Sequence, residues 1–76
     1  MSEKNDQSGL LTPLTEREIE ILQLLVQGMT NPEIGQKLHL APGTVRNYVS
    51  EIFTKLNVSD RTKAAVVAMK LGYYRI

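Results

Sequence analysis

The sequence contains no cysteine and no tryptophan, has one histidine, and is only 5% aromatic. Without cysteine there is neither a disulfide framework nor a thiolate zinc site, the usual supports of a small secreted domain. The single histidine, His39, has no second histidine to share a metal ion, and no phosphate-binding glycine loop or pair of catalytic acids accompanies it. We therefore expect no catalytic residues, no metal site and no cofactor, and an enzyme is the least expected class.

Long apolar runs are also missing. No stretch approaches the roughly 20 apolar residues that span a bilayer, and the first ten residues are too polar for a signal peptide. A chain of 76 residues forms one domain at most. A domain of this size buries only about 60% of the surface of its unfolded chain, so its core is thin. We expect a cytoplasmic location and no membrane partner.

The net charge is small, but the charged residues are unevenly distributed along the chain. The formal net charge is +1, which by itself argues against a nucleic-acid partner. Residues 1–36 hold two cations against six acids, a net charge of −4, whereas residues 37–76 hold seven cations against two acids, a net charge of +5. A basic second half indicates a partner of opposite charge.

Four segments with helical spacing of apolar residues follow a polar stretch. Residues 1–13 are predicted to be a flexible linker or tail, and residues 14–76 the folded domain. No segment alternates in the manner of a strand, so the fold class is all-α, a compact four-helix bundle. The expected helices are Glu16 to Gln27, about Pro32 to His39, about Pro42 to Leu56, and about Arg61 to Leu71.

Local signals define most of these helix ends. Thr15 and Glu18 have the spacing of a capping box at the start of the first helix. Either Thr30 or Asn31 caps the second helix. Helix ends favour a residue in the left-handed conformation, and we expect one at each of three positions: Gly28, Asn57 and Gly72.

Gly35 lies inside the second helix, where glycine costs up to about 1 kcal/mol relative to alanine. The residue is worth that cost where a neighbouring element must approach the helix closely. We therefore predict that a neighbouring helix approaches closely at Gly35.

The third helix has two different faces. At 100° per residue, four apolar side chains fall within about 60° of one another and form a core stripe. They are Val45, Val49, Ile52 and Leu56. The opposite face is polar and without an acid, and its members are Gly43, Arg46, Asn47, Ser50 and Thr54.

This polar face has the chemistry of a DNA-reading helix. Arginine can donate two hydrogen bonds to guanine O6 and N7, and asparagine can pair with adenine N6 and N7. A short helix, a tight turn and a second helix also follow the order of a helix-turn-helix motif, whose second helix enters the major groove. The alternative is a solvated face, or the contact surface of a helical protein-protein interaction module.

A longer set of residues in register identifies the family that this chain resembles. The set comprises LTERE at 14–18, Gly28, TNPEI at 30–34, Leu38, TVR at 44–46, Ile52, KL at 55–56, Val58, Arg61, Ala65, Ala68 and Gly72. Over residues 14–76 the sequence closely resembles the LuxR/NarL-type (FixJ-type) helix-turn-helix DNA-binding domain of bacterial transcription regulators. The resemblance implies sequence-specific binding of double-stranded DNA with the third helix (about 42–56) in the major groove.

The resemblance also implies a set of DNA contacts. Arg46, Asn47 and Ser50 match groove-facing positions of the family, and Thr44 and Lys55 lie near expected backbone contacts. The full expected set of DNA-binding residues is Thr30, Asn31, Lys37, Thr44, Arg46, Asn47, Ser50, Thr54 and Lys55. The chain departs from the family's common residues at Gly35, Ala41, Tyr48 and Ser50.

Arg46 is the one cation on the groove face, so a single domain is expected to hold DNA weakly. We therefore expect the protein to bind DNA as a dimer. The fourth helix has an apolar strip that the core does not need, and we assign it to a homodimer interface formed by Thr62, Ala65, Val66 and Met69. The alternative is that this strip is part of a broad core face of the single chain. A dimer would bind two half-sites about one helical turn apart.

Further partners follow from the resemblance alone. RNA polymerase is one expected partner. Two arrangements stay open for the natural protein: a response-regulator receiver or ligand-sensing domain precedes residue 1, or the chain is a stand-alone regulator, as in some members of the class it resembles.

The acids of the first helix are expected to stay away from DNA. Glu16, Glu18 and Glu20 are assigned to contacts with Lys55 or Arg61, or to solvent. As surface ion pairs they would contribute only about 0 to 1 kcal/mol each.

Overall fold

The helices begin and end close to the predicted residues. The computed structural model describes residues 13–74, and within that range it contains four helices and no strand. They are α1 (Glu16–Val26), α2 (Asn31–Leu38), α3 (Pro42–Leu56) and α4 (Arg61–Lys70). The all-α class is confirmed. The predicted bounds of α3 match, whereas α1, α2 and α4 each end one residue earlier than predicted and α2 also begins one residue earlier, at Asn31.

Side-chain caps start three of the four helices. Thr15 with Glu18, and Thr30 with Glu33, form complete capping boxes at α1 and α2, so the choice between two caps for α2 falls on Thr30. The Asp60 carboxylate caps α4 by accepting from the N–H of Lys63. Helix α3 follows Ala41 and has no side-chain cap.

A residue with positive φ follows the end of each of the four helices, one or two positions after its last residue. Gly28, Asn57 and Gly72 have φ of 93°, 58° and 83°, as predicted, and His39 adds a fourth with φ of 59°. After each of these residues the chain turns back, and the next N–H donates to a carbonyl five residues earlier, as Leu40 does to Gly35 at 2.8 Å. His39 therefore makes the sharp turn between α2 and α3.

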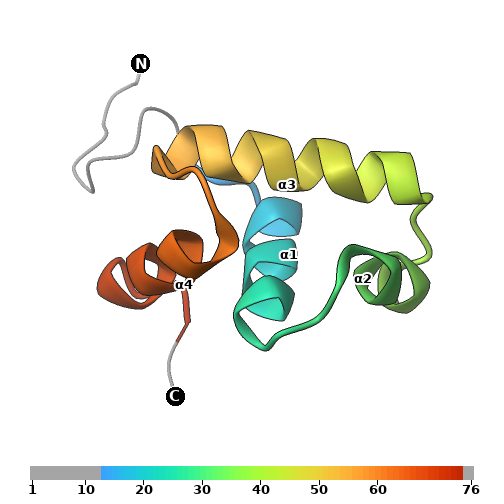
Figure 1. Ribbon diagram of the computed structural model, residues 1–76, viewed down its shortest axis with the longest axis horizontal. Coiled ribbons are helices and arrows are strands. Elements are labelled where there is room, and N and C mark those ends of the chain that lie inside the picture. The colour runs from blue at the N-terminus through green and yellow to red at the C-terminus, as the bar shows by residue number, and fades with distance from the viewer. Residues whose placement is uncertain (1–12, 75–76) are drawn as a thin grey trace.

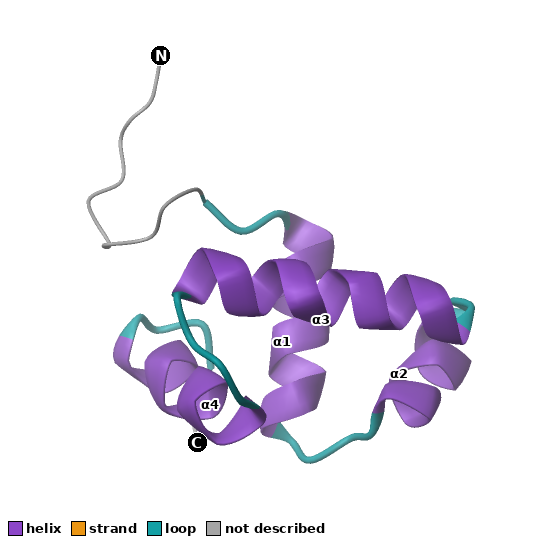
Figure 2. Cartoon of the chain, turned by 45° about the horizontal axis from the view of Figure 1, so that its top comes forward, coloured by secondary structure: helices purple, strands orange, loops and turns teal. Residues whose placement is uncertain are grey.

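Helix α3 lies across α1, while α2 and α4 flank α1 on opposite sides (Figure 1). Figure 2 shows α2 beneath the N-terminal part of α3 and α4 near its other end. Helix α4 packs mainly on α1 and more sparingly on α3. The buried apolar residues are Leu14, Ile21, Leu22, Leu24, Leu25, Ile34, Val45, Ile52, Leu56, Ala64 and Ala68.

The predicted close approach at Gly35 is confirmed. A Cβ atom built on Gly35 would lie 2.8 Å from the backbone oxygen of Leu40 and 3.5 Å from Cγ2 of Val45. Glycine thus lets the α2–α3 turn fold back against α2. This contact fixes how α3 leaves the turn, and so how its polar face is presented.

Candidate nucleic-acid interface

The two faces predicted for α3 are present. Val45 and Ile52 are fully buried, Leu56 is 6% exposed, and Val49 packs against the core as a partly buried residue. The four polar side chains opposite this stripe are all exposed: Arg46, Asn47, Ser50 and Thr54. The core stripe therefore directs the polar face outward.

The first turn of α3 is open to an anion. Pro42 has no N–H, and because no side chain caps the helix, the N–H groups of Gly43 and Thr44 meet no side-chain acceptor there. The Arg46 guanidinium lies beside this turn, since a Cβ atom built on Gly43 would be 3.7 Å from its Nη2. Backbone N–H groups and a guanidinium thus share the same end of the helix.

Seven of the nine expected DNA-binding residues are exposed, and two are partly buried. Thr30 and Lys37 lie on α2 or at its start, and Thr44, Arg46, Asn47, Ser50 and Thr54 lie on α3. The structure brings these seven together on the two consecutive helices of the helix-turn-helix. Asn31 and Lys55 are bound by side chains from distant parts of the chain, whereas the Thr30 hydroxyl is bound only within its own capping box.

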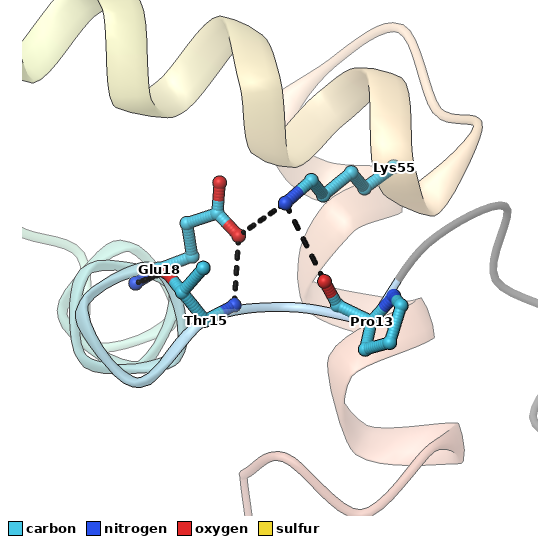
Figure 3. A network of polar contacts seen from close by, with 4 residues as sticks. All are labelled: Pro13, Thr15, Glu18 and Lys55. Carbon is cyan, nitrogen blue, oxygen red and sulfur yellow. Dashed lines mark hydrogen bonds and ion pairs between the residues drawn. The ribbon is translucent and has the colours of Figure 1, made fainter. Parts of the chain in front are cut away.

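The Lys55 ammonium is held inside the domain (Figure 3). Its Nζ donates to Glu18 Oε1 at 2.8 Å and to the Pro13 carbonyl at 3.4 Å. The same Glu18 oxygen also accepts from the N–H of Thr15 at 2.9 Å. These bonds join the C-terminal end of α3 to the start of α1. They leave Lys55 a weaker candidate for a DNA-backbone contact than the sequence suggested.

The expected contact between an acid of the first helix and Lys55 is confirmed for Glu18, whereas the expectation of a weak surface pair is wrong. Its side chain is 5% exposed and that of Lys55 is 16% exposed, so the pair is buried rather than superficial. Burial alone would raise the pKa of the Glu18 carboxyl, but the hydrogen bonds from Lys55 and Thr15 and the Lys55 charge lower the pKa below its ordinary value. Glu16 and Glu20 are exposed as expected, and Glu20 pairs with Arg17 at 3.2 Å.

A second internal contact was not foreseen from the sequence. Arg61, the first residue of α4, donates through Nη1 to the Met29 carbonyl at 2.6 Å and through Nη2 to Asn31 Oδ1 at 3.2 Å. No periodicity or motif could have paired residues 30 or 32 positions apart.

Two hollows flank the helix-turn-helix, and both are open rather than enclosed. One of about 250 Å³ lies between α1 and α3 and is lined by Glu18, Thr44, Asn47, Tyr48 and Glu51. The other, of about 600 Å³, lies at the α2–α3 turn and is lined by Pro32, Gly35, Gln36, His39, Leu40 and Pro42. Glu51 places one acid at the edge of the otherwise acid-free face.

The fourth helix leaves an apolar strip uncovered. Ala64 and Ala68 are buried against the core, whereas Val66 and Met69 are 48% and 43% exposed. Within residues 13–74 these two are the only large hydrophobic residues classed as exposed. Neighbouring Thr62 is exposed and Ala65 is partly buried. The strip assigned to dimer contacts is therefore outside the core of the single chain.

Comparison with known families decides what this arrangement belongs to. The family model described as bacterial regulatory proteins, luxR family, matches residues 12–68. The chain belongs to the luxR family. Membership in this family of DNA-binding transcription regulators agrees with the helix-turn-helix built by α2 and α3.

Curated relatives of this LuxR-family domain are longer proteins. The transcriptional regulatory protein LnrK of Bacillus subtilis (strain 168) is 52% identical over 62 residues, which are 82% of this chain and 28% of LnrK. The transcriptional regulatory protein DegU of Brevibacillus brevis is 46% identical over 63 residues, 83% of this chain and 27% of DegU. The domain thus spans less than a third of these relatives.

Solved structures share the fold. The transcription factor GerE superimposes with a TM-score of 0.73 at 42% identity, covering 79% of this chain and 90% of GerE. The response regulator ChrA of a heme-sensing two-component system gives a TM-score of 0.79 at 38% identity, covering 83% of this chain and 31% of ChrA. A LuxR-type fold therefore occurs both as nearly a whole solved chain and as part of a longer one.

In residues 13–74, no helix is long and apolar enough to cross a membrane.

Proposed function

We propose that this LuxR-type domain recognises a specific double-stranded DNA sequence by placing α3 in the major groove. The observation that supports this most directly is the exposed face of α3, where Arg46, Asn47, Ser50 and Thr54 stand opposite a buried stripe. Arg46 and Asn47 can each make a bidentate contact with a purine, so they would provide most of the discrimination between bases.

The rest of the site would position the helix. The uncapped first turn of α3 offers the N–H groups of Gly43 and Thr44 to a phosphate, aided by the positive end of the helix dipole. Thr30 and Lys37 are exposed on the first helix of the motif, which in such motifs crosses the DNA backbone. Contacts of this kind fix register and orientation without reading sequence.

We propose a homodimer through α4 as the binding form. The face of α3 has one cation, which gives a single domain few charge-assisted contacts with DNA. Val66 and Met69, with Thr62 and Ala65 beside them, form an exposed strip that a second copy could cover by an isologous contact. Two bound domains would read half-sites about one helical turn apart.

The setting of this activity follows from the same proposal. A regulator of transcription works in the bacterial cytoplasm and affects RNA polymerase, directly or by occlusion of a promoter. Since the curated relatives are more than three times as long as the matched segment, we propose that this domain is the output part of a longer regulator with a sensing or receiver domain, the first of the two arrangements considered from the sequence.

Salt dependence distinguishes this function from a protein-interaction module. A dimer that neutralises roughly 6 to 8 phosphates has a log–log slope of binding against salt of about −5 to −7. A module that binds protein through the same polar face would have a much shallower slope. The assay is titration of duplexes first selected from a random library, which also yields the half-site spacing.

Arg46→Ala tests the assignment of α3. We expect it to lower affinity for the selected duplex by about 1 to 3 kcal/mol and to relax the preference at one base pair. Arg17→Ala is the matched control, because it removes the same guanidinium from the exposed surface of α1. An equal loss on all sequences would make Arg46 a backbone contact. An equal loss in both variants would contradict the placement of α3 in the groove.

A further inference from the structure

The Arg61 side chain links α4 to the start of the helix-turn-helix. Helix α4 packs on α1 and α3, and in the described part of the chain it does not pack on α2. The guanidinium of Arg61 spans this separation, because it binds both the Met29 carbonyl before α2 and the Asn31 amide on the first residue of α2.

The chemistry of a guanidinium fixes the orientation of the Asn31 amide. Arginine has five N–H donors and no acceptor, so the amide atom that faces Arg61 must be the oxygen. Oδ1 accepts from Nη2 at 3.2 Å, and the amide NH₂ group is consequently turned away from Arg61. Within residues 13–74 this NH₂ group has no protein acceptor in hydrogen-bonding range. Because Asn31 is only partly buried, the group can reach a partner outside the protein.

We propose that Arg61 is a positioning residue for DNA binding, which acts by holding the Asn31 amide with its NH₂ group directed at a phosphate of the DNA backbone. This inference rests on the proposed DNA-binding function. It gives Arg61 an indirect role in DNA binding, since the two nitrogen atoms at the end of its guanidinium bind protein oxygens.

Arginine suits this role better than lysine. The two acceptors are the Met29 carbonyl oxygen and Asn31 Oδ1, and the planar guanidinium presents a separate nitrogen to each. A lysine at position 61 would keep the charge but would have one nitrogen for both acceptors. The Asn31 amide would then be free to rotate, and part of its contact with DNA would be lost.

A double-mutant cycle on DNA affinity tests the link. We expect Arg61→Lys and Asn31→Ala each to weaken binding of the selected duplex by about 3- to 10-fold per domain, as for one lost hydrogen bond. In the Asn31→Ala background, Arg61→Lys should cost less than about 2-fold further, because its effect passes through the amide. A full, additive loss in that background would mean that Arg61 acts independently and would overturn the proposal.

Asn31→Asp separates a positioning role from a purely structural one. Its carboxylate still accepts from Arg61, and as an ion pair does so more strongly, so we expect an unchanged or higher melting temperature. It also replaces the NH₂ donor by a negative oxygen, so affinity should fall by more than about 10-fold. Gln36→Glu, the same amide-to-carboxylate change at an exposed position of α2, is the control for added charge and should cost only a few-fold.

The outcomes separate this inference from the function on which it rests. If the wild-type domain binds no duplex, the proposed function fails and this inference fails with it. If the wild type binds DNA but Arg61→Lys binds equally well, or Asn31→Asp loses no more affinity than Gln36→Glu, only the positioning role is refuted.

Discussion

Replacing Glu18 by glutamine removes the negative charge of the buried Glu18–Lys55 pair and keeps the shape of the side chain. A glutamine Oε1 can still accept from the Thr15 N–H and from Lys55, which are 2.9 and 2.8 Å away in the native domain (Figure 3). The capping box therefore survives, and what is lost is the counter-ion of an ammonium whose side chain is only 16% exposed.

The size of the effect follows from this burial. Removing one partner of a fully buried pair costs about 3–5 kcal/mol, and the partial exposure of Lys55 reduces our expectation to about 2 kcal/mol. A domain of this length loses about 4–8 °C of melting temperature per kcal/mol, so Glu18→Gln should melt about 8–16 °C lower. Far-UV circular dichroism is the suitable measurement, because the chain has no tryptophan.

Glu33→Gln is a matched control, since Glu33 occupies the same place in the second capping box and is exposed. Both variants lose a charge near a helix N-terminus, which is worth about 0.3–1 kcal/mol, so the difference between them reports the ion pair. Equal melting temperatures for the two variants would refute the reasoning.

The pH dependence supplies an independent check. The folded-state pKa of Glu18 is below its ordinary value of 4.5, so its stabilisation is present above that value and is lost as pH falls through the folded-state pKa. The difference in stability between wild type and Glu18→Gln should therefore shrink on acidification. A difference that stays constant down to acid pH would contradict the assigned pKa direction.

Three further changes test other parts of the domain. His39→Gly should stabilise it by about 0.5–1 kcal/mol in thermal unfolding, because a glycine relieves the left-handed backbone at φ of 59°; a loss of stability would show that the imidazole has contacts that matter more. Ala41→Ser should add about 1 kcal/mol by supplying the missing cap of α3, and an unchanged unfolding midpoint would argue against a cap there. Met69→Glu should weaken DNA binding and leave the monomer folded, since the side chain is 43% exposed; an unchanged sedimentation coefficient of the DNA complex would remove the dimer model.

Much of the fold could be predicted because its signals are local. The Thr15–Glu18 spacing, the glycine after α1 and the periodic apolar residues of α3 each act within one or two turns of helix, and the structure confirms them. His39 was predicted to be the last residue of the second helix, although histidine adopts positive φ more often than most non-glycine residues, and the structure places it in the left-handed turn. It is the closure of α2 against α3, with Leu40 bonded to Gly35, that requires it.

The sequence predicted which helix face forms the candidate site, but not all the hydrogen bonds that the site residues make within the protein. The exposed face of α3 follows from helical geometry once its core stripe is known. The sequence proposed Lys55 both as a DNA contact and as a partner of the acids in α1, and only the structure shows that Glu18 holds it. Nothing in the sequence indicated that Arg61 binds Asn31. The DNA contacts and the dimer strip themselves remain predictions for the experiments above.

The sequence by itself determined the four helices, the capping box of α1 and the division of α3 into an apolar and a polar side, because each depends on neighbours within a few residues. Only the tertiary structure decided which charges stay available for a partner. Bonds between residues 30 or 37 positions apart set the partners of Arg61 and Lys55, and those separations close only when α1 meets α3 and α4. A cationic residue in the sequence is a possible contact with DNA, and packing determines whether another part of the protein already binds its charged group.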